Sequence, residues 1–114
     1  MHELSLCEGI IKVIEDQAVA QNFTKVETVW LEIGEFAGVE LNALRFGFDV
    51  VIKGTVAEQA KLEIITTEGT AWCMPCGETV KVSTRYDACP QCGSHQLQIT
   101  GGDELRIKEL EVND

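Results

Sequence analysis

Four of the five cysteines in this sequence form two closely spaced pairs. Cys73 and Cys76 lie in the segment CMPCG, Cys89 and Cys92 lie in the segment CPQCG, and twelve residues separate the pairs. Two residues between cysteines let one tight turn direct both sulfurs toward one point, and two such turns supply the four thiolates of a closed tetrahedral site. The spacing therefore predicts structural Zn(II) bound by all four cysteines, without the open position that hydrolysis at zinc requires.

Cysteine pairs of this kind also occur in redox proteins, where they form a reversible disulfide. One pair beside a helix suffices for that chemistry, so a dithiol oxidoreductase leaves the second pair without a role. Zinc ribbons can also bind nucleic acid, but between residues 70 and 100 the bases Lys81 and Arg85 are matched by Glu78 and Asp87. A segment of balanced charge is a poor binder of phosphates.

A glycine directly follows each cysteine pair, Gly77 after the first and Gly93 after the second. Glycine adopts positive φ without a steric cost, so we expect backbone N–H groups at these turns to point back at the sulfurs. Such bonds would stabilise a site of four thiolates. Zinc would also supply the folding free energy of this segment, because about 30 residues are too few to bury an adequate core.

The first residues, MHELSLC, offer a second set of metal ligands. The imidazole of His2, the free α-amine and the first backbone amides provide several nitrogens at the spacing that one metal ion requires. Ni(II) favours tetragonal nitrogen coordination and suits such a set better than Mg(II) or Mn(II), although copper and zinc would compete. A terminal histidine is more often solvated, so these residues alone do not decide between a ligand and a free end.

Cys7 and His95 are the remaining candidates for metal ligation. Cys7 falls on an apolar helical stripe with Ile11 and Ile14, which predicts a small buried hydrophobic residue. His95 lies three residues after Cys92 and could replace one thiolate, but a lone histidine is more often a surface residue.

Composition and charge restrict the class of protein. The chain has 114 residues, of which 45% are hydrophobic and 25% charged, as in soluble globular domains. Its formal net charge of −10 disfavours nucleic acid and anionic lipid, so the expected partners are proteins or cations. Because no apolar run approaches a membrane span and no signal-peptide pattern opens the chain, we expect a cytoplasmic protein whose cysteines bind metal instead of forming disulfides.

Local periodicity predicts the elements that position these residues. Apolar residues at three- and four-residue steps predict a helix over 3–20, and the β-branched run KVETVWLEIG predicts a strand over 25–34. A second helix is expected within 39–54, although Gly47 lowers its propensity by about 1 kcal/mol. KLEIITT (61–67) and ELRIKELEV (104–112) have strand character, and a one-residue bulge near Lys108 would keep the apolar residues of the last strand toward the core.

This order predicts an α+β fold, with a small mixed sheet, two helices on one of its faces and an inserted zinc-ribbon-like domain. The expected domains are residues 1–69 with 101–114, and residues 70–100 for the zinc-binding insert.

Several segments together resemble the HypA/HybF family of hydrogenase nickel incorporation proteins. They are MHELSLC at the start, VWLEIG in the first strand, VE at 39–40, RFGFDVVIKGTVAE and the two CxxCG units. The similarity covers essentially the whole chain, and MHELSLC with VWLEIG is closest to the HybF type. The resemblance implies a nickel-binding α+β domain joined to a zinc domain in a cytoplasmic, non-enzymatic metallochaperone.

The family's motifs map onto this sequence residue by residue. Its nickel motif falls on His2 and Glu3, and its zinc motif falls on the four paired cysteines. An acidic residue linked to nickel in some members falls on Glu40, where other members have aspartate. The resemblance further implies transfer of Ni(II) to the [NiFe] hydrogenase large-subunit precursor, a HypB GTPase partner, and in some members a contribution to urease maturation; homodimer formation is left open.

Two other functions remain open from the residues alone. A zinc-ribbon adaptor would bind protein partners and carry no nickel, and a dithiol oxidoreductase would oxidise a cysteine pair reversibly without losing zinc. Neither accounts for His2.

Overall fold

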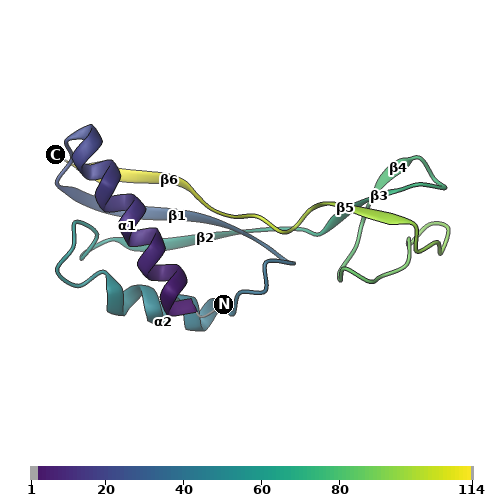
Figure 1. Ribbon diagram of the computed structural model, residues 1–114, viewed down its shortest axis with the longest axis horizontal. Coiled ribbons are helices and arrows are strands. Elements are labelled where there is room, and N and C mark those ends of the chain that lie inside the picture. Colours follow the sequence, from purple (N-terminus) through teal and green to yellow (C-terminus); the bar gives the residue numbers. More distant parts are fainter. Residues whose placement is uncertain (1–2, 114) are drawn as a thin grey trace. The chain divides into compact units, whose positions relative to one another are not determined.

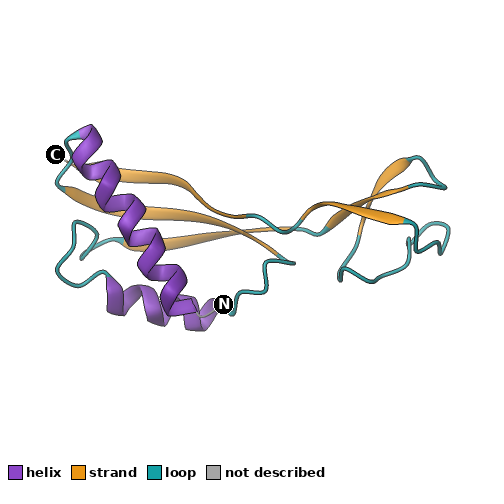
Figure 2. Ribbon diagram, in the orientation of Figure 1, coloured by secondary structure: helices purple, strands orange, loops and turns teal. Residues whose placement is uncertain are grey.

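The structure is a computed structural model that describes residues 3–113 (Figures 1 and 2). Its elements in chain order are α1 (Glu3–Gln21), β1 (Lys25–Gly34), α2 (Leu41–Val51), β2 (Lys61–Thr67), β3 (Thr70–Cys73), β4 (Glu78–Lys81), β5 (Leu97–Gly101) and β6 (Leu105–Asn113). The strands form two three-stranded sheets, ordered β2-β1-β6 and β4-β3-β5. The predicted α+β class and the order of helix, strand, helix, strand, insert and strand are confirmed.

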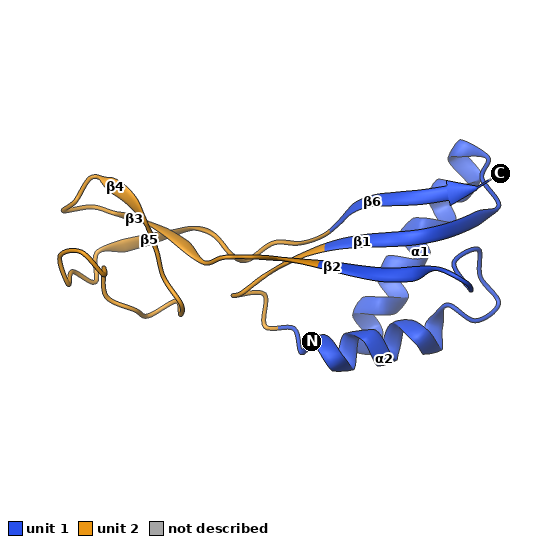
Figure 3. Ribbon diagram, turned by 180° about the vertical axis from the view of Figure 1, so that it is seen from behind, with its two compact units in different colours: residues 1–31, 39–64, 107–114 blue, residues 32–38, 65–106 orange. Residues whose placement is uncertain are grey.

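The chain divides into two compact units (Figure 3). Unit 1 comprises residues 1–31, 39–64 and 107–114, and unit 2 comprises residues 32–38 and 65–106. The expected domain boundaries were residues 70 and 100, so unit 2 is larger than the predicted insert on both sides. The reason is that chain on either side of the ribbon contacts it, as described below.

Unit 1 has a core between its helices and its sheet, with both helices on one face of the sheet (Figure 3). The apolar stripe of α1 is buried from Cys7 through Ile14 to Ala18, as the three- and four-residue spacing predicted. On β1, Val29, Leu31 and Ile33 are buried at every second position. Because the spacing of apolar residues matches the period of each element, each presents one apolar face, and the two faces meet.

The two helices approach closely at Gly47, in the middle of α2. A Cβ atom at Gly47 would lie 3.3 Å from Cys7 Sγ and 3.5 Å from Leu4 Cα. The Cys7 thiol is buried and donates a hydrogen bond to the carbonyl oxygen of Leu44 at 3.3 Å. Burial raises the pKa of this thiol. The glycine that weakens the helix propensity of α2 therefore allows this close packing, and Cys7 is the buried small residue that the sequence predicted.

Substitutions at two helical glycines should change stability in opposite directions. A Cβ atom at Gly9, in α1, would meet no atom within 4 Å, so Gly9→Ala should raise the free energy of unfolding by about 0.5–1 kcal/mol through helix propensity. Gly47→Val should lower it by about 1–3 kcal/mol, because the added methyl groups overpack the contact with Leu4 and Cys7. Urea denaturation would measure both, and a stabilised Gly47→Val variant would contradict the close packing.

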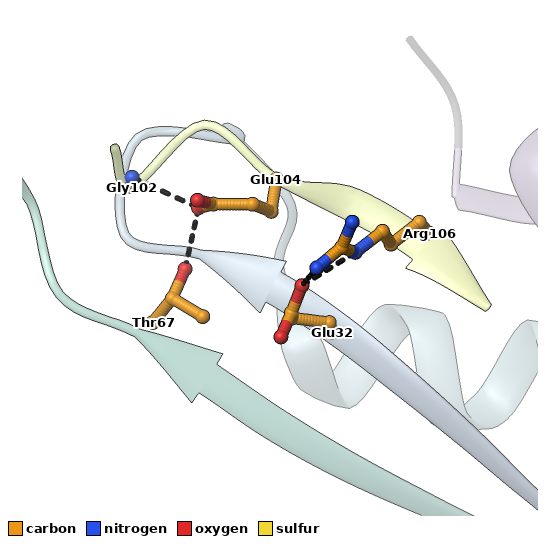
Figure 4. Close-up of polar contacts among 5 residues, drawn as sticks. All are labelled: Glu32, Thr67, Gly102, Glu104 and Arg106. Carbon is orange, nitrogen blue, oxygen red and sulfur yellow. Dashed lines mark hydrogen bonds and ion pairs between the residues drawn. The ribbon is translucent and has the colours of Figure 1, made fainter. Parts of the chain in front are cut away.

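The sheet of unit 1 is mixed, since β1 and β2 run in the same direction and β6 runs in the opposite one (Figures 1 and 4). Contacts on its helix-free face support the predicted bulge. Glu32 contacts Arg106, and Thr28 contacts Glu111. The two residues on β1 are four positions apart, whereas their contacts on β6 are five positions apart. This shift by one position agrees with the extra residue that the sequence predicts near Lys108.

Burial along β6 agrees with this shift for three of the four apolar residues. Leu105, Ile107 and Leu110 are half-buried, while Lys108 and its neighbour Glu109 are both exposed. The prediction for the fourth residue, Val112, is wrong. Val112 is exposed and lines a pocket beside Gln21, because α1 ends there and no longer covers the strand.

Unit 2 is built on the ribbon sheet. Both β4 and β5 pair antiparallel with β3, and Ala71 lies between Val80 on one neighbour and Ile99 on the other. The small core contains Ala71, Val80 and Val82 together with two metal-site cysteines, Cys73 and Cys89. A core this small contributes little stability, which agrees with the expectation that a bound metal stabilises the ribbon.

Residues on both sides of the ribbon belong to unit 2 because of specific contacts. Phe36 packs on the ribbon core, and a Cβ at Gly69 would overlap its ring. The Glu104 carboxylate accepts hydrogen bonds from Thr67 Oγ1 at 2.6 Å and from the Gly102 N–H at 2.8 Å (Figure 4). These bonds, that from Thr67 above all, lower the pKa of Glu104, so the contact is made by the ionised carboxylate.

Candidate metal centre

The four paired cysteines meet at one point in unit 2. Their sulfurs all lie within 4.8 Å of one another, with 3.6 Å between Cys73 Sγ and Cys92 Sγ and 3.9 Å between Cys76 Sγ and Cys89 Sγ. A disulfide bond is about 2.05 Å long, so the sulfurs are not bonded to each other. They form one cluster of four potential ligands, as the spacing of the two pairs predicted.

The cluster fits a tetrahedral metal of the size of Zn(II). Zn–S bonds of about 2.3 Å place the sulfurs of a regular tetrahedron about 3.8 Å apart, which lies between these two sulfur–sulfur distances. Cys73 and Cys89 are buried and Cys92 is exposed, so the cluster lies at the edge of the ribbon core. Four thiolates around one cation leave no position for water, which suits a structural site.

Each pair forms the same kind of turn, and the glycine that follows the pair closes it. Gly77 and Gly93 do have positive φ, 66° and 77°. However, their N–H groups donate to the carbonyl oxygens of Cys73, at 2.8 Å, and Cys89, at 2.9 Å, and not to sulfur. A residue four positions after the first cysteine closes the turn, whereas residues two and three positions after it lie nearer the sulfur.

The N–H groups that point at sulfur come from those earlier positions. The Gln91 N–H donates to Cys89 Sγ at 3.4 Å. Together with the Cys92 N–H, which has the larger effect, it lowers the pKa of Cys89 to about 7. Hydrogen bonds with Cys92 and Cys73 raise the pKa of Cys76, because the thiol proton that forms them becomes harder to remove. A divalent cation takes the place of such protons and allows all four thiols to ionise.

The structure describes only part of the predicted nickel site. His2 lies outside the described residues. Glu3, the first residue of α1, accepts a hydrogen bond on Oε2 from the Glu40 N–H at 3.3 Å. Glu40 is the N-cap of α2, and its own carboxylate accepts from the Ala43 N–H. The fold therefore brings together two predicted ligands that are 37 residues apart in the chain.

His95 does not belong to the cysteine cluster. Its side chain is exposed, and the metal-sized group of side chains among the described residues consists of the four cysteines alone.

Basic side chains of unit 2 are engaged within the unit. Lys81 forms an ion pair with Glu68 at 3.0 Å, and Arg106 forms one with Glu32. The guanidinium carbon of Arg85 lies 5.4 Å from the centroid of the Phe36 ring. Phosphate binding would have to compete with these contacts against an overall charge of −10.

We therefore expect no complex with DNA or RNA at protein concentrations up to about 10 µM and physiological salt. Fluorescence anisotropy with labelled single- and double-stranded oligonucleotides would measure this. A submicromolar complex that weakens steeply with added salt would contradict the prediction.

Comparison with known proteins identifies the family. Residues 1–112 match the model of the family described as "Hydrogenase/urease nickel incorporation, metallochaperone, hypA". Hydrogenase maturation factor HypA of Azotobacter vinelandii is 58% identical over 112 residues, covering 98% of this chain and 99% of that protein. Its counterpart from Alkalilimnicola ehrlichii is 60% identical over 113 residues, covering 99% and 100%. The closer similarity to the HybF type stays a prediction.

Solved structures agree with this similarity. The solution structure of the Ni metallochaperone HypA from Helicobacter pylori matches with a TM-score of 0.71 at 28% identity, covering 98% of this chain and 97% of that one. A second structure, a solution structure of HypA protein, matches with a TM-score of 0.74 at 28% identity, covering 99% and 97%. Among the described residues no helix is long and apolar enough to cross a membrane.

The metal-sized cysteine cluster, the α+β fold and the match over nearly the whole chain agree with one another. The chain belongs to the HypA family of hydrogenase and urease nickel incorporation proteins.

Proposed function

We propose that this protein is a nickel metallochaperone that binds Ni(II) through its N-terminus and transfers it to the [NiFe] hydrogenase large-subunit precursor. The match to a nickel incorporation family over residues 1–112 carries this proposal. The ligands would be His2, the neighbouring backbone and amine nitrogens, and a carboxylate from Glu3. Glu40 is a further candidate, because its backbone N–H contacts the Glu3 carboxylate.

Two different requirements explain two different metal sites. A metal that is handed over must be exchangeable, which suits ligands at a chain terminus. A metal that stabilises a fold must be retained, which suits four converging thiolates with partly buried sulfurs. We therefore assign Zn(II) to Cys73, Cys76, Cys89 and Cys92 as a permanent structural ion, and Ni(II) to the N-terminus as cargo.

The remaining parts of the proposal follow from this role. Handing over a metal ion makes and breaks coordination bonds without chemical turnover, so the protein is not an enzyme. Its partners would be the HypB GTPase and the hydrogenase precursor, and transfer to a precursor would take place in the cytoplasm.

Nickel titration of zinc-loaded protein with a native N-terminus tests the proposal. We expect about one equivalent of Ni(II) to bind, with an absorption spectrum typical of tetragonal nitrogen coordination and with zinc retained. Zinc alone, with no uptake of nickel, would support the adaptor function instead. Reversible oxidation of a cysteine pair with zinc retained would support the oxidoreductase.

A further inference from the structure

The two helices of unit 1 form a groove on the surface of that unit. Its volume is about 440 Å³. It is lined by Leu4, Glu8, Ile11, Lys12 and Glu15 from α1, and by Val50, Val51 and Thr55 from α2 and the following turn. The residues on α1 recur at three- and four-residue steps, so the groove follows this helix for about 16 Å.

The groove contains apolar side chains that the core does not cover. Leu4 is 47% exposed and Val50 is 45% exposed, one on each wall. Phe46, one turn before Val50 on α2, is 72% exposed. Three large apolar side chains near one another favour contact with another molecule, whereas one isolated exposed apolar residue would not.

The walls of the groove are fixed before any partner arrives. Gly47 allows α2 to lie against Leu4 and Cys7, and the Cys7 thiol is hydrogen-bonded across the interface to Leu44. A preformed groove loses little conformational entropy when it is filled, which favours binding.

The charges at the groove are acidic on balance. Glu8 and Glu15 both line it, and neither carboxylate makes a hydrogen bond or ion pair with another described residue. The single lysine of the groove, Lys12, already forms an ion pair with Asp16 at 3.4 Å. A ligand that placed positive charges beside Glu8 and Glu15 would find both carboxylates available.

We propose that this groove binds a basic amphipathic segment of a partner protein. The segment would insert apolar side chains between Leu4 and Val50 and place lysines or arginines beside Glu8 and Glu15. Such helix-in-groove contacts are read through anchors spaced three or four residues apart. A second copy of this chain fits poorly, because its own charge of −10 would be repelled by the same carboxylates. The proposal does not depend on nickel.

Two labelled fourteen-residue peptides can test it on the intact protein without nickel. Both carry leucines at helical steps of three and four; one has lysines at the other positions and the second has glutamates. Anisotropy should show binding of the lysine peptide at least about 10-fold tighter than that of the glutamate peptide. Amide chemical-shift changes should fall on α1 and α2.

Matched variants separate the groove from the general acidity of the protein. Val50→Ser should weaken binding of the lysine peptide at least about 10-fold. Val19→Ser, which alters an 81% exposed valine outside the groove, should change this binding less than about 2-fold. The double variant Glu8→Lys/Glu15→Lys should weaken binding of the lysine peptide at least about 10-fold more than the double variant Glu27→Lys/Glu63→Lys. Both double variants change the net charge equally. Melting curves would establish that each variant is folded.

Three outcomes would overturn the proposal. Equal effects of the two charge-reversal pairs would mean that overall charge alone attracts the peptide. Amide chemical-shift changes confined to the ribbon or to the helix-free face of the sheet would place the peptide-binding surface outside the groove. If light scattering showed a dimer and Val50→Ser dissociated it, the groove would be occupied by a second copy of this chain.

Discussion

Replacing Cys73 with alanine should release the structural metal and unfold the ribbon, while both helices and the β2-β1-β6 sheet remain folded. Cys73 supplies one of four sulfurs and is also fully buried in the small core of unit 2. Structural zinc contributes about 10–16 kcal/mol of apparent binding free energy, far more than a core of this size can replace. The same outcome is expected for Cys89→Ala.

Elemental analysis and amide NMR spectra would measure this result. The metal content should fall from one equivalent to near zero, and the signals of β3, β4 and β5 should lose their dispersion while those of α1 and α2 do not move. Cys7→Ala is the matched control, since Cys7 is equally buried but lies outside the cluster. A Cys73→Ala protein that kept one tightly held zinc and a native ribbon spectrum would rule out the four-cysteine site.

Replacing His2 with alanine should abolish specific nickel binding and hydrogenase maturation, with fold and zinc content unchanged. If the proposed function is right, the substitution removes the imidazole from the set of nickel ligands. Loss of a residue that merely supports a ligand weakens metal binding by about 10- to 100-fold, so loss of a ligand should cost more than about 100-fold. His95→Ala is the matched control, because His95 is the other histidine and is exposed.

Calorimetry with Ni(II) would compare these variants with a protein extended ahead of Met1. The extension converts the α-amine into an amide of little basicity, so it should also weaken binding if that amine is a ligand. The bulky side chain of His2 should protect Met1 from removal. Equal nickel binding by all forms would place the ligands elsewhere, whereas failure of His2→Ala alone would show that the imidazole binds and the amine does not.

The sequence by itself determined the elements and the zinc-type ligand set. Helical steps of three and four and strand steps of two depend on neighbouring residues, so α1, β1 and β2 lie where their local patterns predicted them. The two CxxC turns are equally local, which explains why the sequence alone predicts the cysteine cluster. Nickel was different, because the residues of MHELSLC left the choice open and only the family resemblance favoured it.

Tertiary structure decided the features that depend on residues far apart in the chain. Local pattern could not reveal that Glu3 meets Glu40, since that contact requires the two helix starts to pack together. Local pattern also indicated that Gly47 destabilises its helix, because helix propensity takes no account of the neighbouring helix that packs against this glycine.

The boundary of unit 2 and the groove between the helices have the same origin. Phe36 joins the ribbon through contact with its core, although it precedes the start of β3 at Thr70 by 34 positions in the chain. The groove exists because α1 and α2 cross at a small residue and leave Leu4 and Val50 uncovered. Periodicity predicts which face of an element is apolar, but only packing determines how much of that face another element covers.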